Sequence, residues 1–304
     1  MTREPENPRT ENPFMVEPVH DYVARLLGLA GEDPLAILRS TPGDLARLLA
    51  RVAPPRLARR SDPGKWSIAE ILAHLADAEL VAGYRVRTML ATDAAPIAAY
   101  DQNVWADTFH YATLDPFLSL ELFSAYRTGT LRVSASIDPA QLEHYGVHQE
   151  RGRETVRQLL RLLAGHDINH RTQIERALSA AGDSQSPWNP QPQKPEIPLD
   201  VIERVDLRVG TIVALTEVAN ADRLAQITVD FGSERRQVVA GIRQERTDLS
   251  SIVGRQALFY FNLPKKQIRG LTSEAMLCDA GYADGLIPVF LQPERPVPDG
   301  VRAE

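Results

Sequence analysis

The sequence predicts a two-domain protein in which an all-α helical bundle precedes a small all-β barrel. The length of 304 residues is about twice that of a typical domain. A proline-rich stretch interrupts the chain, and the spacing of apolar residues changes across it. Hydrophobic residues make up 43 % of the chain and charged residues 24 %, which provides enough apolar material for two cores.

Proline sets the predicted domain boundaries. Residues 1–18 hold four prolines among polar residues and predict a flexible tail, and residues 182–198 hold five more. Proline has no N–H group and restricts the residue before it, so neither a helix nor a central strand is expected to run through such a segment. The predicted organisation is therefore a tail (1–18), a bundle (19–181), an extended linker (182–198) and a barrel (199–304).

Before the linker, apolar residues recur at the three- and four-residue spacing of amphipathic helices. Ser67 and Glu70 have the spacing of a capping box, which predicts that a helix begins after Ser67. A second long helix is predicted within residues 154–178. The apolar positions that support these two helices are Ile68, Ile71, Leu72, Leu75, Val156, Leu159, Leu160 and Leu163.

After the linker, short β-branched runs alternate with glycine and aspartate, as in antiparallel strands joined by turns. In the last of these runs, alternation places Phe259 and Phe261 on one face and Tyr260 on the other. The predicted strands cover residues 209–213, 225–231, 237–240 and 257–261.

Composition excludes several classes of protein. The single cysteine, Cys278, forms no internal disulfide and contributes to no cysteine-rich metal site, which fits a reducing cytoplasm. Apolar runs fall short of the roughly 20 residues of a membrane span, and the first residues lack the apolar segment of a secretory signal. We therefore expect a cytoplasmic protein with no membrane partner. The formal charge of −6 argues against indiscriminate nucleic-acid binding, so RNA binding would need a local cationic patch.

Three histidines in the helical half form a candidate metal site. His166 and His170 are spaced i,i+4 on one helix face, and His74 falls on or beside the inward face of the earlier helix. Buried imidazoles are costly without partners, and a metal ion is a partner they can share. Three histidines would leave an open coordination position, and imidazole suits zinc, nickel, iron and copper alike. The structural alternatives are a surface histidine pair and a hydrogen-bonded core histidine.

The segments W-S-I-A-E-I-L-A-H-L-A-D at 66–77 and G-H-D-I-N-H-R-T-Q-I at 165–174 resemble the DinB-like superfamily over about residues 20–181. The resemblance implies an up-down four-helix bundle with a metal triad of His74, His166 and His170. Known relatives include thiol-dependent transferases, hydrolases and isomerases, so a low-molecular-weight thiol and a metal-dependent S-transferase or hydrolase activity are implied. The resemblance supports the metal more strongly than the reaction, and it identifies no catalytic residue.

Other polar residues lie close to this motif in the sequence. Asp77 and Asp167 are the candidate carboxylate partners of the histidines. His148 and Arg151 are interpreted either as lining the mouth of the pocket or, more simply, as a surface turn.

The barrel half holds a cationic loop. Lys265, Lys266 and Arg269 follow the predicted strand that ends at Phe261, where clustered cations can bind phosphates. From residue 196 to residue 304 there are 13 Lys and Arg against 16 Asp and Glu. Charge by itself therefore favours a solvated loop over an RNA-binding surface.

The ordered motifs of this half are more specific than its charge. D-x-R-V-G-x-I at 206–212, N-A-D-R-L at 220–224 and N-L-P-K-K-x-x-R-G-x-x-S-E-A-M-L at 262–277 resemble the tRNA-binding OB-fold domain. That domain ends some methionyl-tRNA synthetases and occurs in tRNA-binding cofactors and CsaA-type chaperone-like proteins. The chain departs from the family at Val218–Ala219, where His-Pro is frequent, and at Ala275, where Gly is usual.

The resemblance implies a small OB-fold barrel that binds tRNA or another structured RNA and pairs into a homodimer. The residues that it places at the RNA are Lys265, Lys266 and Arg269, with Asn262, Ser273 and Glu274 in accompanying positions and Arg208 as a weaker addition.

Three hypotheses follow. The first is a tRNA-binding module joined to a metal-binding bundle. The second is a metal-dependent enzyme of the bundle superfamily, with the barrel used for dimerisation or localisation. The third is a CsaA-like chaperone.

Overall fold

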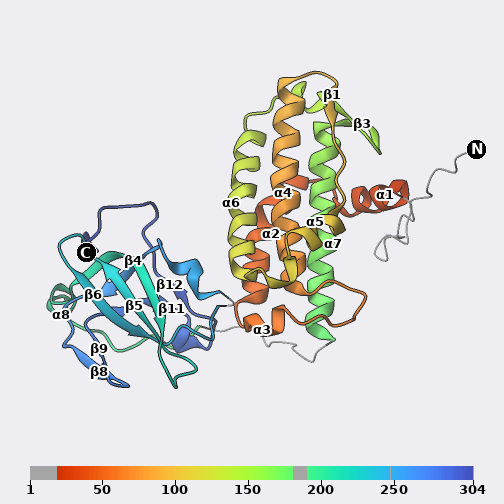
Figure 1. Cartoon of the computed structure of the whole chain (residues 1–304). Coiled ribbons are helices and arrows are strands. Elements are labelled where there is room, and N and C mark those ends of the chain that lie inside the picture. Colours follow the sequence, from red (N-terminus) through yellow and green to blue (C-terminus); the bar gives the residue numbers. More distant parts are fainter. Residues whose placement is uncertain (1–18, 181–189, 247, 304) are drawn as a thin grey trace, which may run out of the picture. The chain divides into compact units, whose positions relative to one another are not determined.

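The computed structural model describes residues 19–180, 190–246 and 248–303, and the chain divides into two compact units (Figure 1). The predicted tail at 1–18 and residues 181–189 of the predicted linker lie outside the described residues. Residues 190–198 are exposed and have no regular secondary structure. The order of an all-α unit followed by an all-β unit confirms the predicted fold class.

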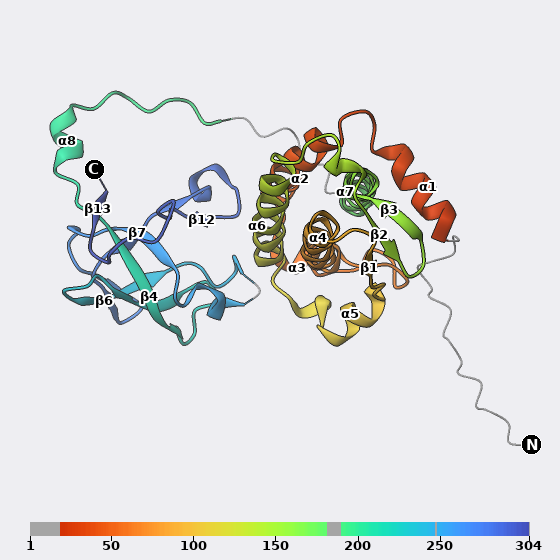
Figure 2. The same ribbon diagram turned by 90° about the horizontal axis from the view of Figure 1, so that it is seen from above.

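The part of the chain before the linker is dominated by long helices. Figure 2 looks down the bundle and shows α4 between α6 and α7, both of which it contacts, while α1 packs on α7. Apolar residues from α2, α4, β1 and α7 form the main core of the bundle, and a smaller cluster gathers around Tyr111. The helices are α1 (Val19–Leu29), α2 (Pro34–Leu49), α3 (Pro54–Leu57), α4 (Ile68–Ala91), α5 (Gln102–Thr108), α6 (Pro116–Ser134) and α7 (Val156–Ser179).

Capping boxes start the two helices that matter most for the site. At α4, the Ser67 hydroxyl accepts from the Glu70 amide at 3.2 Å, and Glu70 Oε2 accepts from the Ser67 amide at 2.7 Å. This confirms the predicted start of the helix. Thr155 and Gln158 form the same motif at α7. Each box satisfies amide groups that a helix start leaves without intrahelical partners, so both start points are set locally.

A small sheet at one end of the bundle was not predicted. It contains β1 (Ala95–Ile97), β2 (Tyr145–His148) and β3 (Gly152–Thr155), with β1 parallel to β2 and β2 antiparallel to β3. The interpretation of His148 as part of a surface turn is wrong, because His148 ends β2 and is only 2 % exposed. The turn occupies the residues that follow it. Strands of three or four residues are too short to give a clear alternating pattern.

The second unit is a curled antiparallel sheet of the OB-fold type with the strand order β10-β7-β4-β5-β6. The long strand β4 pairs with β7 through its first half and with β5 through its second, and a bulge falls between Ile212 and Ala214. A bulge increases local twist and lets one strand serve two parts of a curved sheet. The elements are α8 (Leu199–Glu203), β4 (Leu207–Glu217), β5 (Ala225–Asp230), β6 (Arg235–Ala240), β7 (Gln256–Tyr260), β8 (Lys266–Ile268), β9 (Leu271–Ser273), β10 (Met276–Leu277), β11 (Asp279–Ala280), β12 (Val289–Phe290) and β13 (Arg302–Ala303).

The barrel core is built by alternation along these strands. Ile227 and Val229 of β5 are fully buried, as is Phe259 of β7, and the Phe231 ring packs edge-on against Phe259. Tyr260 lies on the other side of β7 and is partly exposed. The predicted faces of Phe259, Tyr260 and Phe261 are therefore confirmed, and the two phenylalanines belong to the core.

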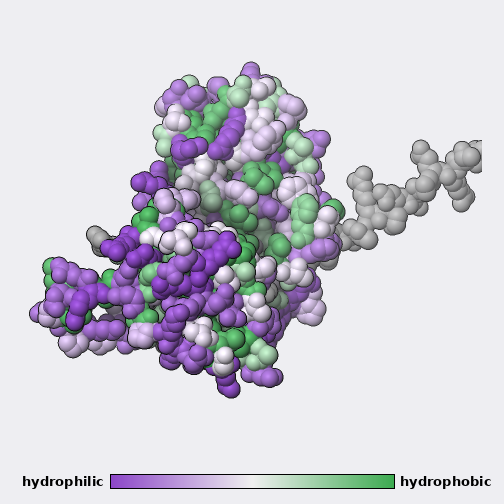
Figure 3. All heavy atoms as spheres, turned by 60° about the vertical axis from the view of Figure 1, so that its left-hand side comes forward, coloured by the Kyte–Doolittle hydropathy of each residue, from purple (hydrophilic) through white to green (hydrophobic). Residues whose placement is uncertain are grey.

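Hydrophilic residues cover most of the face shown in Figure 3, with apolar side chains scattered among them. In the described part of the chain, no helix has both the length and the apolar character that crossing a membrane requires.

Candidate metal centre and nucleic-acid interface

Two helices bring three histidines together in the bundle. His74 comes from α4, and His166 and His170 come from α7, one turn apart. The Nε2 atom of His166 lies 3.0 Å from Nε2 of both His74 and His170. One nitrogen from each ring lies within 4.8 Å of the others. Two ligands of a tetrahedral ion with bonds of about 2.1 Å are roughly 3.4 Å apart, so this spacing suits a shared metal.

Hydrogen-bond accounting favours the same interpretation. The Nδ1 atom of His170 donates to Gln173 Oε1 at 2.9 Å, which leaves a lone pair on its Nε2. A neutral imidazole carries only one N–H. Protons alone therefore cannot turn both contacts of the His166 Nε2 atom, to His74 and to His170, into full hydrogen bonds. The Nδ1 atoms of His74 and His166 are buried without hydrogen-bond partners. A cation among the Nε2 atoms would satisfy all three lone pairs at once.

Burial keeps these rings neutral, which is the form that binds a metal. Burial lowers the pKa of His166 to about 4, and Arg127 adds to the effect. The pKa values of His74 and His170 also fall well below the usual range, first because both rings are buried and then because the histidines repel one another's charge. His74 is 2 % exposed and His170 6 %.

The candidate carboxylate partners have other contacts. Asp167 binds the Arg127 guanidinium through both oxygens, at 2.7 and 3.0 Å, and Arg127 also donates to Glu79 at 2.9 Å. Asp77 accepts a hydrogen bond from the Tyr111 hydroxyl. Neither aspartate orients a histidine ring as the sequence suggested. Gln173 orients the His170 ring instead, by accepting a hydrogen bond from its Nδ1. The sequence analysis did not identify Gln173, although its i+3 spacing from His170 places both side chains on one helix face.

A hairpin holds the cationic residues of the barrel. Strands β8 and β9 are joined by Arg269 and Gly270, with φ of 50° and 82°. Two successive positive φ values are typical of a type I′ turn, which matches the twist of a two-stranded hairpin. Lys265, Lys266 and Arg269 are all exposed. Lys265 Nζ lies 2.7 Å from Glu274 Oε1. Among the described residues, no carboxylate forms an ion pair with Lys266 or Arg269.

The other predicted RNA residues take part in contacts within the barrel. Asn262 accepts from the Asp206 amide and donates to the Arg204 carbonyl, at 3.0 and 2.7 Å. The Ser273 hydroxyl is buried between the Val239 amide and the Ala275 carbonyl.

Two further predicted residues support the same region. Glu274 Oε2 accepts from the Gln237 amide at 3.0 Å and thereby joins β6 to the end of the hairpin. Arg208 pairs with Asp206 at 2.8 Å and lies over the Phe261 ring. These side chains shape the base of the hairpin.

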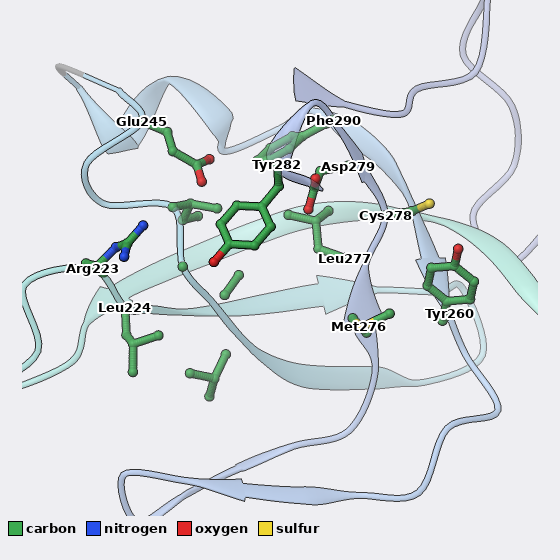
Figure 4. Close-up of a pocket in the computed structure, with 14 residues that line it drawn as sticks. Arg223, Leu224, Glu245, Tyr260, Met276, Leu277, Cys278, Asp279, Tyr282 and Phe290 are labelled. Carbon is green, nitrogen blue, oxygen red and sulfur yellow. The ribbon is translucent and has the colours of Figure 1, made fainter. Parts of the chain in front are cut away.

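A pocket of about 570 Å³ opens elsewhere on the barrel. Figure 4 shows Arg223 and Glu245 at one end, and Tyr260 and Cys278 at the other. Burial raises the pKa of Glu245 to about 6. The remaining lining is largely apolar and includes Leu224, Val239, Ile242, Met276, Leu277 and Phe290.

Comparisons with known proteins divide the chain in the same way. Residues 37–174 match the model of the DinB superfamily, and residues 207–302 match the family described as "Putative tRNA binding domain". The methionine–tRNA ligase of Parabacteroides distasonis is 32 % identical over 129 residues, which is 42 % of this chain and 19 % of that protein. That of Chlorobium chlorochromatii is 42 % identical over 92 residues, which is 30 % of this chain and 13 % of that protein. The chain thus spans a fifth or less of the length of these relatives.

Two solved structures are also similar to parts of the chain. A MetRS-related protein from Pyrococcus horikoshii has 26 % identity and a TM-score of 0.34, covering 36 % of this chain and 100 % of its own. YfiT from Bacillus subtilis, described as a probable metal-dependent hydrolase with an unusual four-helix bundle topology, has 19 % identity and a TM-score of 0.47. The matched region covers 59 % of this chain and 94 % of the YfiT chain.

Fold and site together define a two-module protein, a helical bundle with a three-histidine cluster followed by a small barrel with a cationic hairpin. The bundle is a DinB-superfamily domain, and the barrel is an OB-fold domain of the tRNA-binding family.

Proposed function

We propose that this protein binds tRNA in the cytoplasm through the β8–β9 hairpin and holds a divalent metal in its bundle. The observation that carries the first part is a pair of exposed cations, Lys266 and Arg269, without carboxylate partners in the described residues of a domain that matches the tRNA-binding family. The bend of the hairpin presents both to solvent, where phosphates can reach them. Lys265 would join them when phosphate replaces Glu274 as its partner.

Salt-dependent binding tests this proposal. Binding of the full chain to unfractionated tRNA is measured across a range of salt concentrations for the wild type and for Lys266→Ala/Arg269→Ala. Each lost phosphate contact lowers the slope of log affinity against log salt by about 0.9, so we expect a slope shallower by about 2. The matched control is Arg235→Ala/Arg302→Ala, which removes two exposed cations that already pair with Asp230 and Asp206. Equal slopes in both double variants would refute the hairpin as the binding surface.

The bundle would hold the metal through Nε2 of His74, His166 and His170. The three converging Nε2 atoms, which protons alone cannot pair, and the neutral, buried state of the rings support a resident cation, and the all-imidazole donor set suits zinc, nickel or iron. A metal with three neutral ligands and an open position acidifies a bound water or thiol. The chain contributes the fixed geometry of the rings, and Trp66 packs against the His74 ring at 5.0 Å between centroids.

Elemental analysis of purified full-length protein tests the metal. We expect about one equivalent of a divalent metal in the wild type and a large loss in His170→Ala. His110→Ala is the control, because His110 is exposed and lies outside the cluster. A folded wild type that takes up no metal when zinc, nickel or iron(II) is added would refute the site.

The open position favours a second candidate function, a metal-dependent thiol S-transferase or hydrolase with the barrel used for dimerisation or localisation. Two assays of the metal-loaded chain test this candidate. One measures transfer of a low-molecular-weight thiol to an electrophile, and the other measures hydrolysis of an ester. Activity that is lost in His170→Ala but kept in Lys266→Ala/Arg269→Ala would make the bundle the functional centre.

We also propose a homodimer that forms through the barrel. Residues near α8 expose apolar side chains that a partner would cover, namely Ile197, Leu199, Ile202 and Val205. Sedimentation equilibrium of the wild type and Ile202→Asp tests this. A dimer that the substitution dissociates supports the proposal, and a wild-type monomer refutes it.

The barrel pocket favours a third candidate, a CsaA-like chaperone activity. The apolar part of its lining, which includes Met276 and Phe290, suits side chains of an unfolded polypeptide. Suppression of aggregation by the wild type, and its loss in Met276→Asp, would support this candidate. Selective binding of tRNA without such suppression would refute it.

A further inference from the structure

Arg85 is a buried cation that none of the proposed functions uses. It lies on α4 and is 8 % exposed. Its Nη2 donates to the Ala98 carbonyl at 2.7 Å, and its guanidinium lies 5.8 Å from the centroid of the Tyr100 ring. It forms no ion pair with any carboxylate in the described part of the chain. A buried charge is costly unless an opposite charge compensates it, so Arg85 lacks a partner that its position requires.

His148 is a buried donor without an acceptor. Its Nδ1 accepts from the Glu150 amide at 3.2 Å, so the proton of the neutral ring lies on Nε2. That Nε2 is buried and has no hydrogen-bond partner. Leaving such a donor unpaired is unfavourable, and an incoming acceptor would recover that cost.

The fold places these two donors in one layer. Ile97 of β1 pairs in register with His148 of β2, and the next residue, Ala98, is the one that accepts from Arg85. His148 is on the buried face of the sheet, and α4 contacts both strands. The donors therefore meet between α4 and the sheet.

Three other charged residues lie near these donors. Arg151 donates through Nε and Nη2 to Glu154, at 3.1 and 3.0 Å, and Glu150 also acts on the charge of Arg85 without pairing with it. Burial, and then Arg151 and Arg85, lower the pKa of His148 to about 4, so its ring is neutral near pH 7 and remains a donor. Among the described residues, Arg85 has no ion-pair partner of its own.

We propose that Arg85 and His148 bind the carboxylate of a small organic acid. Both side chains only donate here, one charged and one neutral, and together they suit the two oxygens of a carboxylate. Their burial excludes a nucleic-acid backbone as the bound group. Arg85 also lies on the same face of α4 as His74, about 16 Å along the axis. That the acid is a substrate of the histidine cluster rests on the proposed function. That Arg85 and His148 bind a carboxylate does not.

Saturation-transfer NMR with propionate tests the site in the full chain at fixed ionic strength. We expect binding by the wild type that weakens at least tenfold in Arg85→Gln and about threefold to tenfold in His148→Phe. Arg87→Gln is the matched control and should bind as the wild type does. Arg87 is an exposed arginine on the same helix, and its side chain donates to the Gly83 and Gly129 carbonyls.

Several results would overturn the proposal. These are no propionate binding by the folded wild type, unchanged binding in both Arg85→Gln and His148→Phe, or inorganic phosphate bound more tightly than propionate. If Arg85→Gln fails to fold by circular dichroism, His148→Phe and Arg85→Lys decide the question. Propionate binding that persists in His166→Ala/His170→Ala supports the site even if the metal proposal fails. Binding that EDTA abolishes would place the carboxylate on the metal and refute the role of Arg85.

Discussion

The Nδ1–H of His170 donates to Oε1 of Gln173 at 2.9 Å, three residues further along the same helix. This bond fixes the tautomer of the ring and directs the Nε2 lone pair toward His74 and His166. It is therefore the contact by which α7 prepares one of its histidines for a metal.

Removal of this acceptor is expected to weaken metal binding. Gln173→Ala frees the ring to rotate and to change tautomer, so we expect zinc affinity, measured by competition with a chelator, to fall about tenfold. Gln173→Glu keeps an acceptor and should retain or increase the affinity. Thr172→Ala is the control on the same helix, since the Thr172 hydroxyl bonds only to the Ile168 carbonyl. Equal affinities in Gln173→Ala and the wild type would contradict the role of Gln173.

Replacement of Arg127 is expected to destabilise the bundle strongly. Arg127→Met removes the guanidinium that pairs with Glu79 and Asp167, and both of these carboxylates are buried. An uncompensated buried charge costs about 3–5 kcal/mol, which urea unfolding would measure. Arg132→Met on the exposed side of α6 should change stability by less than about 0.5 kcal/mol. A loss of similar size in both variants would show that the buried network is not the cause.

Gly165 allows α1 to approach α7. A Cβ at this position would lie 1.8 Å from the Leu26 carbonyl oxygen, a backbone atom that cannot move alone. Gly165→Ala should therefore displace α1 and cost about 2–3 kcal/mol in thermal or urea unfolding. Gly129→Ala in α6 meets only an ordinary contact with Arg87 at 3.6 Å and should be neutral or stabilising. Equal stability of the two variants would refute the close approach.

The hairpin conformation can be tested without a change in charge. Gly270 has φ of 82°, which a β-branched residue adopts only with strain, so Gly270→Val should distort the turn beside Arg269. We expect tRNA affinity in gel-shift titrations to fall several-fold. Gly254→Val carries the same backbone penalty at φ of 87° with open space around it, and it should bind tRNA normally. A matching loss in both variants would mean general destabilisation of the barrel.

Acid is expected to destabilise the bundle through His148. Its pKa is lowered to about 4 in the folded protein by burial, Arg151 and Arg85, and is near 6.5 when unfolded. Between these values the unfolded chain binds more protons, so stability falls as the pH drops from about 6.5 toward 4. After allowance for partial screening by solvent, the contribution is about 2 kcal/mol.

Urea unfolding of wild type and His148→Gln at pH 7.5 and pH 5 measures most of this contribution, because every other titratable group is common to both proteins. The wild type should lose about 1–1.5 kcal/mol more than the variant, since pH 5 lies inside the window. Parallel losses in the two proteins would contradict the assignment to His148.

The sequence by itself determined the features that depend on neighbours a few residues apart. The capping box at Ser67 and Glu70, the one-turn spacing of His166 and His170, and the alternation of Phe259 and Tyr260 are all local, so their geometry follows from helix and strand periodicity. The motif resemblances likewise predicted both domains from the sequence.

Only the tertiary structure decided which distant groups meet. His74 is 92 residues from His166, and Arg127 is 40 residues from Asp167. In the folded chain Asp167 pairs with Arg127, and His148 is buried on the face of its sheet that α4 contacts. Nothing in the local pattern distinguishes these residues from surface ones. The reason is physical: a buried polar side chain takes whichever partner helix packing brings within hydrogen-bond distance, and that choice depends on the whole core.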